Sequence, residues 1–83
     1  MPVDLFFTNK DRLKLFLKSK RYWKTHEIIR WGVDNYSNRA NRYKQELVQE
    51  GFLRHLPQEE KYRLFGMIKE DVYESLEYVG VAA

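Results

Sequence analysis

Apolar positions in the first fifty residues recur every three or four residues, a spacing that predicts helices. A first helix is predicted over residues 9–20, because Thr8 and Asp11 have the spacing of a capping box at its start. A short extended piece follows it. A second helix of two to three turns is predicted from Thr25 to about Gly32, where turn-forming residues begin.

A third helix is predicted from Ser37 to about Glu50, with Gly51 in the position that commonly ends a helix. One stripe of this segment is apolar and is expected to face the core: Tyr36, Ala40, Tyr43 and Leu47. In so short a chain, aromatic residues at helical spacing or beside a strand are usually buried. We therefore expect four of them in the core rather than stacked on bases: Trp23, Trp31, Tyr36 and Tyr43.

After Gly51 the pattern changes to that of β-strands. Residues 52–56 and 62–68 are rich in aromatic and branched side chains, and a polar loop beginning at Pro57 separates them, which predicts a β-hairpin. Residues 70–78 have apolar positions that fit a short final helix. The predicted fold class is α+β: a three-helix core, a two-stranded hairpin and a short C-terminal segment. One domain is expected over residues 1–83, with its core at 8–68 and an acidic segment at 69–83.

Composition restricts the class of protein further. The chain has 83 residues, of which 43% are hydrophobic and 16% aromatic, as in a folded single domain. It has no cysteine, which excludes a disulfide scaffold, a thiolate zinc site and a cysteine nucleophile. No apolar run approaches the ~18–20 residues of a membrane span, and the start lacks a signal-peptide pattern. We therefore expect a soluble, cytoplasmic protein with no membrane contact.

Charge is distributed unevenly, although the net charge is only +3. Residues 8–45 have a net charge of +8, because they include eleven basic residues and three acidic ones. Residues 46–63 have a net charge of −1, and residues 64–83 have −3. A basic first half followed by an acidic tail indicates a polyanionic partner.

The polar face of the third predicted helix has side chains that can read DNA bases. Arginine pairs with guanine O6 and N7, and asparagine and glutamine pair with adenine N6 and N7. No acidic residue occurs between Ser37 and Gln45. The candidate base contacts are Asn38, Asn41, Arg42 and Gln45. The alternative is an ordinary solvated helix face of chance composition.

The order of the elements resembles that of a winged helix-turn-helix domain. The residues that carry the resemblance are Thr25–Trp31 as the supporting helix, Ser37–Glu50 as the recognition helix and Leu47–Leu53 at its junction with the wing. The turn between Gly32 and Ser37 is longer than the tight turn of simple helix-turn-helix repressors. Lys44 also stands where such helices often carry a core leucine, so Tyr43 is expected to fill that volume.

The resemblance implies sequence-specific binding of double-stranded DNA, as in a small transcriptional regulator. The recognition helix would enter the major groove, and basic and hydroxyl groups around it would contact phosphates. The candidate phosphate contacts are Lys24, Thr25, Ser37, Arg39, Lys44, Arg54, Lys61 and Arg63. For Lys61 and Arg63, local pairing with Glu59 and Glu60 is an equal alternative. Regulators of this size without an effector domain are also common in phages and viruses.

Two further hypotheses concern partners. A homodimer could form through apolar residues of the C-terminal segment: Val72, Tyr73, Leu76 and Val79. Equally, that segment could simply cover the first helix. The rival function is a winged-helix adaptor that binds protein within a larger nucleic-acid-processing complex.

The sequence contains no motif that is typical of an enzyme. It has no glycine-rich phosphate loop and no nucleophile–base pattern around Ser19, Ser37 or Ser75. His26 and His55 have no spacing typical of a metal site. We expect no catalytic residues, no metal, no cofactor and no small-molecule ligand.

Overall fold

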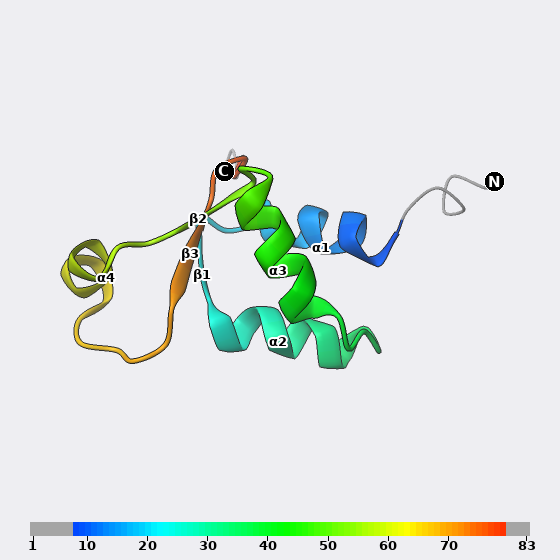
Figure 1. The fold of residues 1–83 in the computed structure, drawn as a ribbon, viewed down its shortest axis with the longest axis horizontal. Coiled ribbons are helices and arrows are strands. Elements are labelled where there is room, and N and C mark those ends of the chain that lie inside the picture. Colours follow the sequence, from blue (N-terminus) through cyan, green and yellow to red (C-terminus); the bar gives the residue numbers. More distant parts are fainter. Residues whose placement is uncertain (1–7, 80–83) are drawn as a thin grey trace.

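The computed structural model describes residues 8–79. Its elements are, in chain order, α1 (Asn9–Leu17), β1 (Tyr22–Lys24), α2 (Thr25–Asp34), α3 (Ala40–Gln49), β2 (Leu53–His55), α4 (Gln58–Phe65) and β3 (Val72–Ser75). The fold class is α+β, with four helices and a three-stranded antiparallel sheet in these residues. Figure 1 shows α1, α2 and α3 grouped on one side of the sheet and α4 on the other.

The sheet has the strand order β1-β3-β2, so the last strand in the chain is the central one. Both neighbours pair with it antiparallel: Trp23 lies opposite Tyr73, and Arg54 lies opposite Glu74. All four residues of β3 are buried. The C-terminal part of the described chain is therefore needed to join the other two strands into one sheet.

A local signal explains where α1 begins, but α1 and α2 end at other residues than predicted. The Thr8 hydroxyl accepts a hydrogen bond of 3.1 Å from the Asp11 amide, and the Asp11 carboxylate accepts one of 3.1 Å from the Thr8 amide, which confirms the capping box. Helix α1 ends at Leu17, earlier than predicted. Helix α2 continues past Gly32 to Asp34. Gly32 is therefore not the helix end.

The glycine at position 32 has a packing role instead. Gly32 is buried where α2 meets α3, and a Cβ atom there would lie 2.7 Å from both Ala40 Cβ and the Ser37 carbonyl oxygen. A hydrogen bond of 2.7 Å from the Ser37 amide to the Gly32 carbonyl ties the two segments together. The missing side chain lets the start of α3 lie directly against α2.

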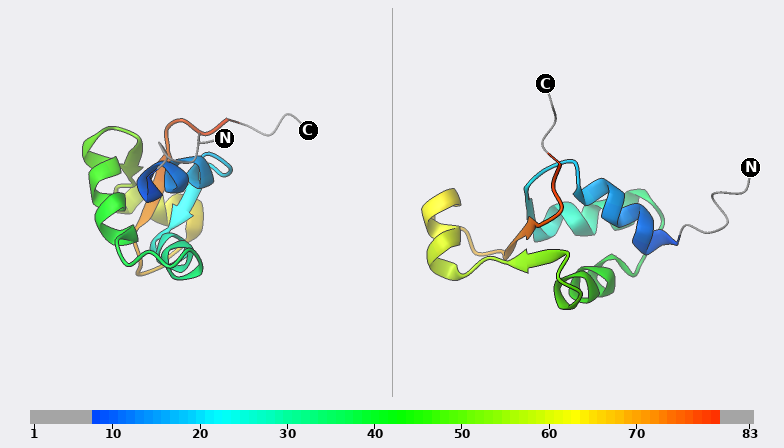
Figure 2. Two further views of the ribbon diagram at one scale, coloured as in Figure 1. Left: turned by 90° about the vertical axis from the view of Figure 1, so that its right-hand side faces the viewer. Right: turned by 90° about the horizontal axis from the view of Figure 1, so that it is seen from above.

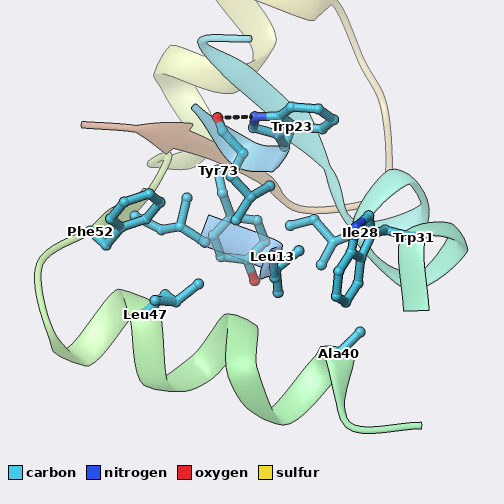
Figure 3. Packing of buried hydrophobic residues seen from close by; sticks show 10 residues of the cluster. Leu13, Trp23, Ile28, Trp31, Ala40, Leu47, Phe52 and Tyr73 are labelled. Atoms are coloured by element: carbon cyan, nitrogen blue, oxygen red, sulfur yellow. Dashed lines mark hydrogen bonds between the residues drawn. The ribbon is translucent and has the colours of Figure 1, made fainter. Parts of the chain in front are cut away.

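The hydrophobic core lies between the sheet and helices α1, α2 and α3 (Figure 3). Its buried members are Leu13, Leu17, Trp23, Ile28, Trp31, Ala40, Leu47, Phe52, Leu53 and Tyr73. The Trp23 indole N–H is satisfied inside this core, because it donates to the carbonyl oxygens of Leu17 at 2.9 Å and Lys20 at 2.8 Å. The expected burial of both tryptophans is confirmed.

The predicted hairpin is correct only in its first strand. Residues 58–65 form helix α4, whereas residues 62–68 were expected to form the second strand. Pro57 precedes α4, and Glu59 and Glu60 occupy its first turn, where carboxylates favour the positive end of the helix dipole. Gly66, with φ of 80°, follows its last residue.

The predicted C-terminal helix is also wrong, because Val72–Ser75 is strand β3. Side chains on both faces of β3 are buried, which removes the polar–apolar alternation of a half-exposed strand. Both views in Figure 2 place α3 at an edge of the molecule. This arrangement leaves the outer face of α3 uncovered.

Candidate nucleic-acid interface

The outer face of α3 brings the four candidate base contacts to the surface. Asn41, Arg42 and Gln45 are exposed on the helix, and Asn38 is exposed in the turn that leads into it. Arg39 is exposed beside them as the residue before the helix, although helix α3 begins at Ala40 rather than at Ser37. Ser37 is half-buried. The sequence therefore predicted this group correctly as surface residues that lie together.

Two acids, Glu46 on α3 and Glu50 directly after it, pair with a lysine of α1. The Lys10 ammonium lies 3.0 Å from Glu46 and also pairs with Glu50. The hydrogen bond from Lys10 lowers the pKa of Glu46, and a weaker contribution comes from Arg42, whose Nε lies 3.1 Å from the same carboxylate. With its Nε on Glu46, Arg42 keeps its terminal amino groups for an acceptor outside the protein.

Lys44 differs from its neighbours because it points to the sheet rather than to solvent. Only 8% of this residue is exposed, and its Nζ lies 5.1 Å from the centroid of the Tyr73 ring. The expectation that Tyr43 fills this volume is therefore only partly right. Both residues contribute, because the Lys44 stem is buried and Tyr43 packs against the core while partly exposed.

The beginning of α2, where Lys24 and Thr25 were expected to contact phosphate, is already occupied by the segment before β3. The Thr25 amide donates to the Asp71 carbonyl at 3.1 Å, and the His26 amide donates to the Glu70 carboxylate at 3.0 Å. The hydrogen bond from the His26 amide lowers the pKa of Glu70, so a carboxylate fills the anion position at this helix end. Lys24 is half-buried, with its Nζ 5.8 Å from the Phe65 ring.

In the segment from β2 to β3, two of the three expected phosphate contacts bind the protein itself. Arg54 donates to Glu60 at 2.6 Å and to Glu74 at 2.7 Å. Lys61 is 7% exposed and donates to the Glu70 carbonyl at 3.1 Å. Only Arg63 is exposed on α4 without a carboxylate partner among residues 8–79.

Tyr36 lies on the surface, whereas its spacing with Ala40, Tyr43 and Leu47 predicts a core position. It is 97% exposed and has a φ of 55°, the only positive φ of a residue other than glycine in residues 8–79. A left-handed backbone costs a tyrosine roughly 1–2 kcal/mol. The signal in the sequence was the turn itself, where Asp34 and Asn35 precede Tyr36 and favour local backbone bonds over helix.

The residues of the predicted dimer contact are split between the core and the surface. Val72 and Tyr73 are buried within the central strand, so they are not available to a second chain. Leu76 and Val79 are exposed. The contact as predicted, through all four side chains, is therefore wrong.

Both histidines pair with consecutive acids before β3: His26 Nδ1 with Glu70 at 2.9 Å, and His55 Nε2 with Asp71 at 3.1 Å. Within residues 8–79, no three or more histidine, aspartate or glutamate side chains are grouped closely enough to hold a metal ion. None of the helices in this part of the chain is both long and apolar enough to cross a membrane. Comparisons with protein-family models, with curated proteins and with solved structures find no match to this chain.

Proposed function

We propose that this chain binds double-stranded DNA as a winged helix, with α3 in the major groove. The sequence-specific contacts would come from the outer face of α3, and the protein would act as a small transcriptional regulator by occupying its site. The phosphate contacts would be Arg39, next to this face, and Arg63 from α4. Arg54 and Lys61 are left out of this interface because they bind the protein itself.

The observation that carries the proposal is the chemistry of the exposed α3 face. Asn38, Asn41, Arg42 and Gln45 are all exposed, and each can form a bidentate pair with a base edge in the major groove. The acids of the helix, Glu46 and Glu50, are paired with Lys10. A surface of amides and arginines without unpaired carboxylates can contact both base edges and the neighbouring phosphates.

The topology gives independent support. The order helix–strand–helix–helix–strand–helix–strand, with β2 and β3 paired in one sheet, is compatible with a winged helix. In this chain the link between β2 and β3 would be an unusual wing, because it contains helix α4 rather than a plain loop. That helix would lie beside the DNA backbone, with Arg63 towards it.

A selection from a random DNA pool, followed by titration at several salt concentrations, tests the proposal. Specific binding should give a log–log slope of about −0.9 for each phosphate contact, or about −2 for Arg39 and Arg63 together. The selected site should also be preferred over unrelated DNA at every salt concentration. Absence of binding to any DNA at low salt would refute the proposal.

A second candidate function, binding a partner protein, is favoured by a different surface. A shallow, largely apolar groove of about 780 Å³ lies where α1 and β1 meet α2, and its lining includes the exposed Phe16, Ile29 and Val33. Exposed apolar surface of this kind is typical of interaction sites. Val33→Lys separates the two functions, because it should abolish capture of a protein partner and leave DNA affinity unchanged.

A further inference from the structure

Lys44 has a buried stem and an ammonium group without an anionic partner. It is 8% exposed, and within residues 8–79 no carboxylate lies within ion-pair distance of its ammonium group. Its one close electrostatic neighbour is the face of the Tyr73 ring, 5.1 Å from Nζ to the centroid. The low exposure therefore belongs mainly to the aliphatic stem, and the ammonium group has no partner of opposite charge within residues 8–79.

The ammonium group lies beside a groove between α3 and the sheet. This groove has a volume of about 300 Å³, and its lining residues are Lys44, Gln45, Val48, Gln49, His55 and Tyr73. The His55 and Tyr73 rings lie side by side with centroids 5.2 Å apart, and the two glutamines come from the helix opposite. The lining thus combines one cation, two amides and two rings, with no carboxylate.

The second buried lysine shows what a structural role requires. Lys61 is buried to the same extent, at 7% exposed, but its Nζ donates to the Glu70 carbonyl at 3.1 Å. The Lys44 ammonium has no hydrogen-bond acceptor within residues 8–79. In this part of the chain the one unpaired side-chain atom that is fully enclosed by protein is Ser75 Oγ, so Lys44 Nζ is not fully enclosed. The Lys44 ammonium therefore remains accessible from the groove.

One acid lies near the groove without lining it. Asp71, exposed at the start of β3, pairs with His55 Nε2 at 3.1 Å. Burial first, and the charge of Asp71 second, raise the pKa of Tyr73, so its hydroxyl stays neutral. The Asp71 carboxylate should weaken the attraction of the groove for an anion.

We propose that this groove binds a phosphate group, with Lys44 as its cation and Gln45 and Gln49 as amide donors. This inference rests on the proposed function, because the phosphate group would then belong to the DNA backbone. Gln45 connects the two sites, because it lines the groove and also belongs to the face that would read bases. The bound phosphate would therefore lie beside the nucleotide that Gln45 reads.

Lys44→Met tests the proposal, because methionine keeps much of the length of the stem and removes the charge. The variant should unfold at about the same temperature as the natural protein, since no hydrogen bond or ion pair within residues 8–79 is lost and the stem stays apolar. Its DNA affinity should fall about tenfold, and the magnitude of its salt slope should fall by about 0.9. Lys44→Arg should recover part of the affinity.

The matched control is Lys61→Met, which removes the other buried lysine. It should lower the unfolding temperature, because the Glu70 carbonyl loses its donor, and the folded protein should keep its DNA affinity. If Lys44→Met binds DNA with the affinity and salt slope of the natural protein, the DNA backbone is not the source of the phosphate. If the natural protein binds no DNA, the proposed function fails, and the next titration alone decides about the groove.

Titration with inorganic phosphate, followed by NMR signals of the His55 ring, separates the two sources. A response in the natural protein that is absent in Lys44→Met supports a phosphate site in the groove. If Lys44→Met loses this response and keeps full DNA affinity, the groove takes free phosphate and not the backbone. If the natural protein gives no response and Lys44→Met does not alter DNA binding, the proposal is overturned. Asp71→Asn should strengthen the response, because it removes the nearby carboxylate.

Discussion

The outer face of α3 and the segment from β2 to β3 carry the same kinds of basic residue in opposite environments. On α3, Arg39 is exposed without a carboxylate partner among residues 8–79, and Arg42 shares its one carboxylate with Lys10. In the β2–β3 segment, Arg54 binds two carboxylates and Lys61 binds a backbone carbonyl. A basic residue is available to a polyanion only where the fold does not already satisfy it, so α3 is the stronger candidate interface.

The largest effect is expected from Gly32→Ala, which should disturb the placement of α3 itself. The new Cβ would lie 2.7 Å from Ala40 Cβ and from the Ser37 carbonyl oxygen. Alanine favours helix by about 1 kcal/mol over glycine, but the clash with backbone should outweigh this gain. We expect a net loss of about 2 kcal/mol in the free energy of unfolding, measured by urea denaturation. A variant as stable as the natural protein would contradict the close packing of α2 on α3.

Arg54→Met should have the next largest effect, on stability alone. The hydrogen bond from Arg54 lowers the pKa of Glu60; for Glu74, burial opposes the decrease but the bonds from Arg54 and Arg21 outweigh it. Because the pKa values of these acids are lower in the folded protein, the pairs stabilise it above about pH 4.5 and this contribution is lost as pH falls through the lowered values. Thermal unfolding should therefore show a deficit of several degrees at pH 7 that shrinks below pH 4.

The same variant sharpens the comparison through DNA binding. Since Arg54 is satisfied within the protein, folded Arg54→Met should bind DNA within about twofold of the natural affinity. A loss of tenfold or more, measured at a temperature where the variant is folded, would show that Arg54 contacts DNA after all.

Tyr36→Gly should give the smallest change in stability and change it in the favourable direction. Glycine adopts the positive φ of this position without strain, and Tyr36 makes little contact because it is 97% exposed. The relief of this strain should exceed the cost of the greater entropy that glycine gives the unfolded chain. We therefore expect the free energy of unfolding to rise by roughly 0.5 kcal/mol. If Tyr36 contacts DNA beside Asn38, affinity should fall in the same variant. Tyr36→Phe, which keeps the ring and the strain, is the control.

The helices of the core could be predicted because their signals are local. Thr8 and Asp11 cap α1, and Gly51, with φ of 85°, follows α3 as expected from its position. The exposed amides and arginine of α3 were predicted for the same reason, since helical periodicity alone separates the faces of a helix. A single sequence was sufficient for these features.

The β2–β3 segment could not be predicted in the same way. Tyr62–Phe65 has the aromatic and branched composition of a strand. Pro57, Glu59 and Glu60, by contrast, are typical of the start of a helix. Val72–Ser75 lacks alternation because side chains on both of its faces are buried, which depends on the rest of the fold. The partners of Arg54 and Lys61 likewise come from the fold and not from neighbouring residues.

The most direct test compares Arg42→Ala with Arg30→Ala in DNA titrations on a selected site. Both arginines are exposed on helices, with 71% and 77% of their side chains accessible, and both pair with a carboxylate four residues later. They differ in position, because Arg42 lies on the outer face of α3 and Arg30 lies on α2. If α3 reads the bases, Arg42→Ala should lose affinity about tenfold or more and show relaxed base preference, while Arg30→Ala should bind as the natural protein does. Equal losses in both variants would contradict it.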